Sequence, residues 1–190
     1  QWKSSVSTAR KHYHHAAYRF LVAADIWISL TLLLAIAMSI PAINVFTHGT
    51  HITVAHTMGA TIGINTFLLL AFTFDILQNS CVSINKSLKW INSGYYTANI
   101  SLFVFWISLI IAGILKAKWQ MNDAKIPFAT MMLQLRPYFI LFFISGIALI
   151  TGLYFIIFPL LKNQTICYYR KVIKKGATKQ QKDFSLYAID

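Results

Sequence analysis

Four apolar runs, each about twenty residues long and nearly free of charge, constrain this chain more than any other feature. A helix of that length crosses a hydrocarbon core of about 30 Å. Hydrophobic residues make up 57% of the 190 residues and charged residues only 12%, a balance too apolar for an ordinary soluble domain. The sequence therefore predicts an all-α integral membrane protein with four transmembrane helices. The expected spans are residues 20–40, 51–77, 97–115 and 138–161.

The basic residues lie outside these runs, and their distribution predicts the orientation of the chain. The net charge of +12 is compatible with nucleic-acid binding, but 13 of the 17 Lys and Arg residues fall on one side of the predicted spans. Such an excess marks the cytoplasmic side. We therefore expect no nucleic-acid partner and two cytoplasmic termini. Residues 1–19 form a basic cytoplasmic or interfacial segment, and residues 162–190 form a basic cytoplasmic tail beside membrane lipid.

The second run starts with side chains that bind metals. It carries His48, His51, His56 and Met58 within a short stretch, and imidazole and thioether are common axial ligands of heme iron. Positions two apart on a helix point to nearly opposite sides, since each residue turns by about 100°. His56 and Met58 therefore cannot share one metal, but each can hold a different heme. The alternative for Met58 is plain apolar packing, whereas a histidine inside a membrane helix indicates a function by default.

The same run carries small and polar residues that predict contacts on several sides. Gly59 and Gly63 form a GxxxG pattern, which allows another helix or a flat macrocycle to approach the backbone closely. The hydroxyl and amide residues around them indicate a helix buried in a bundle: Thr53, Thr57, Thr61, Asn65 and Thr66. A loop is expected at residues 78–96, with a turn at Asn92-Ser93-Gly94.

One stretch of this run resembles a known family. The residues Thr47-His48-Gly49-Thr50-His51-Ile52-Thr53-Val54-Ala55-His56 are similar to the start of the tenth helix in nitric oxide reductase catalytic subunits, members of the heme-copper oxidase superfamily. The segments from Arg19 to Asn44 and from Leu135 to Tyr138 look like the preceding helix and the start of the last one. The resemblance covers most of residues 10–160. It implies that the four helices are the last four of a twelve-helix bundle in the inner membrane of a bacterium.

The resemblance also implies a set of cofactors. His56 matches the proximal ligand of the high-spin heme, at which nitric oxide is reduced to nitrous oxide, and two hemes b are expected in the full complex. Met58 stands where the family has a histidine that binds the low-spin heme, so either this heme has His/Met ligation or its site is altered. His48 falls near the heme propionates of related oxidases, and His51 is an interfacial polar residue or a propionate donor.

Other ligands expected from the resemblance are missing from this sequence. The family's non-heme iron is held by three histidines and often a glutamate, whereas this chain has no glutamate. A non-heme iron or copper would thus be held by residues on another chain or a missing segment, with a cytochrome c subunit or quinol as the electron donor. This predicts a part of an oxidoreductase complex that is inactive alone. Two alternatives stay open: an oxygen-reducing oxidase or nitric oxide dismutase of the same superfamily, and a non-catalytic electron-transfer or assembly subunit.

Overall fold

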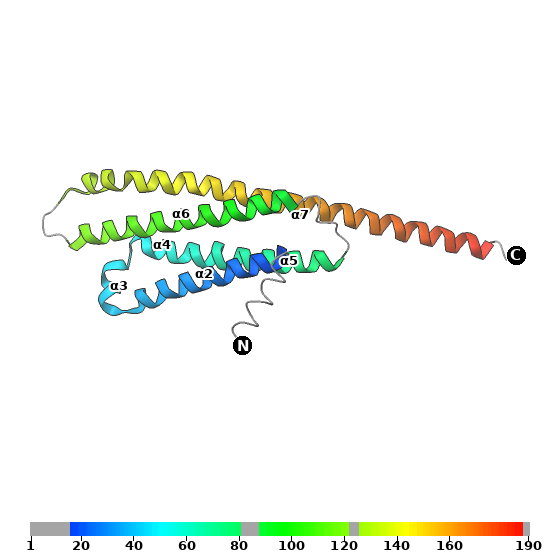
Figure 1. The fold of residues 1–190 in the computed structure, drawn as a ribbon, viewed down its shortest axis with the longest axis horizontal. Coiled ribbons are helices and arrows are strands. Elements are labelled where there is room, and N and C mark those ends of the chain that lie inside the picture. Colours follow the sequence, from blue (N-terminus) through cyan, green and yellow to red (C-terminus); the bar gives the residue numbers. More distant parts are fainter. Residues whose placement is uncertain (1–15, 81–87, 122–125, 188–190) are drawn as a thin grey trace.

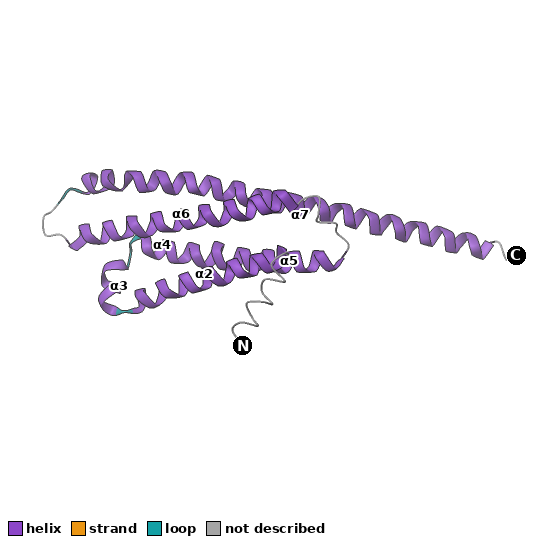
Figure 2. Ribbon diagram, in the orientation of Figure 1, coloured by secondary structure: helices purple, strands orange, loops and turns teal. Residues whose placement is uncertain are grey.

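The computed structural model describes residues 16–80, 88–121 and 126–187, and helices make up nearly all of them (Figure 2). Four of these helical segments are long and apolar enough to cross a membrane, as the sequence predicted. The elements are α2 (Ala16–Ser39), α3 (Pro41–Thr47), α4 (His51–Met58), η1 (Gly59–Thr66), α5 (Phe67–Ser80), α6 (Leu88–Met121) and α7 (Phe128–Tyr187).

The long helices form two antiparallel pairs that lie side by side (Figure 1). Helix α2 packs along η1 and α5, and α6 packs along α7. The two pairs are joined mainly where α4 packs on α6. The final part of α7 projects beyond the other helices (Figure 1).

Aromatic side chains pack both within the two pairs and between them. At one end, the ring of Phe20 stacks on Phe74 at 5.1 Å and meets Tyr95 edge-on at 5.2 Å. Further along, Phe105 of α6 lies 4.3 Å from Phe142 of α7, measured between ring centroids. Such ring contacts fix the spacing of α2, α5, α6 and α7, and the edge-on pair of Phe20 and Tyr95 has a geometry that aromatic rings favour.

The two glycines of the GxxxG pattern lie against α2 of the same chain. A Cβ atom on Gly63 would lie 2.5 Å from Cγ of Trp27, and one on Gly59 would lie 2.8 Å from Oγ1 of Thr31. Only glycine leaves room for such an approach. The predicted close contact with a helix is therefore confirmed, and its partner is the preceding transmembrane helix.

The loop expected at residues 78–96 is shorter than predicted, and the prediction of a turn at Asn92-Ser93-Gly94 is wrong. Helix α6 begins at Leu88, so these residues lie in its first turns. Asn92 accepts a hydrogen bond from the Arg19 guanidinium. A Cβ atom on Gly94 would lie 2.7 Å from the carbonyl oxygen of Gly152. Residues that are typical of turns thus serve helix packing here.

The other helices also extend beyond the predicted spans. Helix α2 begins at Ala16 and α7 runs from Phe128 to Tyr187, so residues 162–187 of the predicted tail are helical. Helix α7 contains Pro137 and Pro159, which remove backbone donors from its interior. Most of the predicted basic segment 1–19 lies outside the described residues.

Candidate functional site

The loop before α4 positions the site, and local hydrogen bonds explain its shape. Gly49 has a φ of +70°, a conformation that costs other residues about 1–2 kcal/mol. Its carbonyl accepts a hydrogen bond from Nζ of Lys116 at 2.9 Å. Thr50 caps α4 by accepting from the backbone N–H of Ile52 at 3.3 Å, and its own hydroxyl donates to the Thr47 carbonyl at 2.7 Å. The chain therefore enters the second membrane span in one fixed direction.

Directly after Met58, the helix changes its winding. Residues Gly59–Thr66 form a π-helix, and the hydroxyl of Thr66 donates to the carbonyl of Thr61, five residues back, at 3.2 Å. Short π segments inside α-helices are rare and often lie at functional sites. The sequence analysis predicted a continuous α-helix here, because hydrophobic periodicity does not distinguish the two windings over so few residues.

His56 lies at the side of α4 with its imidazole half-buried. Its Nδ1 atom is buried and makes no hydrogen bond within the described chain. A buried polar atom without a partner costs about 1–3 kcal/mol, so this imidazole is suited to bind something outside the chain's own helices. Within residues 16–80, 88–121 and 126–187, no three His, Cys, Asp or Glu side chains form a metal-binding group. His56 can therefore supply one axial ligand, but no complete metal site is formed around it.

A stripe of threonines on α4 and η1 separates His56 from Met58. Thr53, Thr57 and Thr61 are exposed, and at about 100° per residue His56 and Met58 lie on opposite flanks of Thr57. Thr57 donates to the Thr53 carbonyl at 3.0 Å and Thr61 to the Thr57 carbonyl at 2.8 Å. These hydroxyl protons are satisfied within the helix, so the stripe can face an apolar environment. The polar face was expected to be buried in a bundle, but no described helix covers it.

Met58 is half-buried and packs against the central hydrophobic core. This contact accounts for the side chain without a metal, in keeping with the usual packing role of methionine. The opposite placement of Met58 and His56 stays a prediction from the helical spacing.

The two other histidines of the motif lie at the end of the bundle where α4 begins. His48 is exposed and lines an open pocket of about 550 Å³ together with side chains of α3 and α6. His51 is half-buried and meets the ring of Phe139 edge-on at 5.2 Å. Neither belongs to a metal-binding group among the described residues.

The structure adds two polar residues that the sequence analysis missed. Oγ1 of Thr31 and Nε1 of Trp106 are buried and lack hydrogen-bond partners in the described part of the chain. Both converge on Gly59, where a Cβ atom would lie 2.8 Å from the hydroxyl oxygen and 3.3 Å from the indole nitrogen. Gly59 lies three residues after His56, so the hydroxyl of Thr31 and the indole of Trp106 approach the helix within about one turn of the candidate ligand. The small residue Gly59 was a signal for a close neighbour, but not for its identity.

Most of the chain matches a known protein family. The family model described as cytochrome c and quinol oxidase polypeptide I matches residues 2–148, a stretch that includes the Gly49 loop, α4 and η1. The chain belongs to this family. Members of the cytochrome c and quinol oxidase polypeptide I family are membrane oxidoreductases of the heme-copper type, so the superfamily expected from the sequence is confirmed. A search of the curated proteins finds no match to the chain.

The residues of this oxidase-family chain fit one axial contact to heme. His56 offers an imidazole ligand next to a stripe that no described helix covers, and its Nδ1 atom is buried without a hydrogen-bond partner among the described residues. Met58 fits less well, because its side chain already packs in the core. A macrocycle bound here would therefore rest on His56 and on helices beyond the described residues.

Proposed function

We propose that this chain provides the heme-ligating helix of a membrane nitric oxide reductase. In this proposal, His56 is the proximal ligand of the high-spin heme, where nitric oxide is reduced to nitrous oxide. The observation that carries the proposal is the half-buried imidazole of His56, whose Nδ1 atom has no hydrogen-bond partner among the described residues, on a membrane helix inside the family-matched region.

The chain's own residues hold and orient the cofactors. Bound heme would supply the iron that takes up electrons and nitric oxide. Lys116 and Thr50 fix the start of α4, and Gly59 and Gly63 lock the helix against α2, so the imidazole of His56 keeps one position. A second heme b on the opposite flank would have Met58 as a ligand, which tends to raise a heme's reduction potential. His48 and His51, at the end of the bundle, are suited to contact propionates.

The rest of the machinery lies outside this chain. The non-heme iron or copper and the other low-spin ligand require residues from the remaining helices of the catalytic subunit. Electrons come from a cytochrome c subunit or quinol. The excess of basic residues on one side of the spans supports cytoplasmic termini, and the resemblance to nitric oxide reductases supports the inner membrane of a bacterium.

Oxygen reduction is a second candidate function, because the matching family is described as oxidases. Both reactions use the same helix and the same proximal histidine in this account. The substrate therefore distinguishes them, and the residues of this chain do not.

Gas consumption by the purified membrane complex tests the proposal. With an artificial electron donor, we expect the wild type to consume nitric oxide and release nitrous oxide, and His56→Ala to lose this activity. Thr73→Ala is the matched control, since this side chain lies further along the same span and donates only to the Leu69 carbonyl. Oxygen consumption without nitrous oxide formation would favour the oxidase. Full activity of His56→Ala would favour a non-catalytic electron-transfer or assembly subunit.

A further inference from the structure

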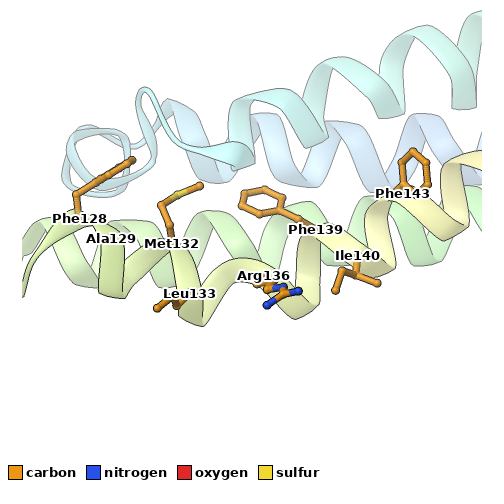
Figure 3. Close-up of a pocket in the computed structure, with 8 residues that line it drawn as sticks. All are labelled: Phe128, Ala129, Met132, Leu133, Arg136, Phe139, Ile140 and Phe143. Atoms are coloured by element: carbon orange, nitrogen blue, oxygen red, sulfur yellow. The ribbon is translucent and has the colours of Figure 1, made fainter.

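An open apolar groove runs along the first third of α7. It has a volume of about 810 Å³, which is within the range of about 300–1,000 Å³ typical of ligand sites. Figure 3 shows the side chains that line it: Phe128, Ala129, Met132, Leu133, Arg136, Phe139, Ile140 and Phe143.

Arg136 is the one charged residue among these eight. Within the described part of the chain it makes no hydrogen bond or ion pair, and it is exposed. Leu133 and Ile140 lie on the same open side of the helix as the guanidinium (Figure 3). A charge on an apolar membrane face is costly unless it is paired or reaches the interface, and at the interface a guanidinium is well suited to pair with a lipid phosphate.

A contact between helices places Arg136 at the boundary of the membrane. Phe139, one turn further along α7, packs edge-on against His51 at 5.2 Å. His51 is the first residue of one candidate membrane span, whereas the candidate span on α7 is counted from Phe128. The sequence places the start of that last span at residue 138, directly after Arg136, so we take Arg136 to lie level with the entrance of both spans. Phe143 lies about 10 Å deeper at 1.5 Å per residue. The groove thus leads from a cation at the interface into the hydrocarbon layer.

Pro137 adds an acceptor beside this cation. It lies inside α7 and has no backbone N–H, so the carbonyl of Leu133, four residues earlier, loses its usual helical donor. The groove therefore combines the guanidinium donors of Arg136 with a carbonyl that lacks its usual i+4 donor, four residues before Pro137.

We propose that this groove binds an anionic glycerophospholipid of the phosphatidylglycerol type. Its phosphate pairs with Arg136, a headgroup hydroxyl donates to the Leu133 carbonyl, and an acyl chain lies along Phe139 and Phe143. The lipid would also support Phe139, whose ring contacts the first residue of the ligand helix. The proposal does not depend on heme ligation by His56.

Native mass spectrometry of the purified complex, reconstituted in vesicles of equal phosphatidylglycerol and phosphatidylcholine, tests this proposal. We expect the wild type to retain phosphatidylglycerol in preference to phosphatidylcholine, and Arg136→Gln to weaken that retention by about tenfold, as for one lost charge-assisted hydrogen bond. Arg136→Lys should keep part of the preference. Lys118→Gln is the matched control, because it removes a charge from an exposed position on α6 outside the groove.

A second variant, which keeps the charge of Arg136, tests the groove even if Arg136→Gln does not fold. Ile140→Trp fills the groove from an exposed position and should also release the lipid. Equal retention of phosphatidylglycerol by the wild type and both groove variants would overturn the proposal. Equal retention of the two lipids by the wild type would also overturn it.

Discussion

Replacing Gly63 by alanine should force α2 and η1 apart. The new Cβ atom would lie 2.5 Å from Cγ, 2.6 Å from Cδ2 and 2.9 Å from Cβ of Trp27, whereas carbon atoms pack best at about 3.5–4.0 Å. The helices must therefore separate locally by about 1 Å. Trp27 cannot swing away, because it is only 3% exposed and its ring meets Trp106 edge-on at 6.0 Å. Overpacking of this kind costs about 1–3 kcal/mol.

Gly146→Ala provides the matched control. A Cβ atom there would lie 3.6 Å from the nearest atom, in the ring of Phe105, which is an ordinary contact. Gly146→Ala gains a helix propensity of about 1 kcal/mol without overpacking, whereas Gly63 lies in the π-helix. The difference in stability between the two variants therefore contains the overpacking as its main part.

Thermal unfolding of the purified complex, followed by tryptophan fluorescence, measures this difference. We expect Gly63→Ala to melt below the wild type and Gly146→Ala to melt at or above it. Trp27→Leu combined with Gly63→Ala should lose less than the sum of the single changes, since neighbouring residues couple by about 0.5–3 kcal/mol. If Gly63→Ala melts as high as Gly146→Ala, the described packing of α2 on η1 is wrong.

Three further predictions concern the loop and the buried polar pair. Gly49→Val should destabilise the complex by about 1–2 kcal/mol in thermal unfolding, because the φ of +70° at this position is strained for any residue with a Cβ atom. An unchanged melting temperature would argue against this loop conformation. Thr50→Ala should cost about 1 kcal/mol by removing the cap of α4, and Thr50→Ser should restore most of it in the same assay. Trp106→Phe should cost less than about 1.5 kcal/mol of stability, since it keeps an aromatic ring and removes a buried donor that has no partner among the described residues. Trp106→Ala should cost about 3–5 kcal/mol in the same assay. Equal losses would indicate that the indole N–H has a partner in the complex.

The sequence predicted those features of the fold that depend on local composition. The length of the apolar runs predicted the membrane helices, whereas the Thr50 cap was seen only in the structure. Contacts between residues that are distant in the sequence were not predicted. The GxxxG pattern indicated a close neighbour, but Trp27 and Thr31 became its partners only through the antiparallel placement of α2. Asn92 and Gly94 looked like turn residues, because their roles in packing depend on Arg19 and Gly152.

For the site, the sequence identified the ligand types and their helical spacing. The opposite placement of His56 and Met58 follows from the 100° turn per residue. The π-helix after Met58 and the polar pair behind Gly59 were not predicted, because they depend on backbone winding and on the approach of α6. Heme ligation by His56, Met58, His48 or His51 stays a prediction.

The reduced-minus-oxidised heme spectrum of the purified native complex tests the central claim most directly. The account predicts that His56→Ala loses the high-spin heme signal, and that Met58→Ala shifts the low-spin signal while the high-spin signal stays. Unchanged spectra in both variants would contradict the assignment of heme ligands to this helix, and would make a non-catalytic membrane subunit the better description of the chain.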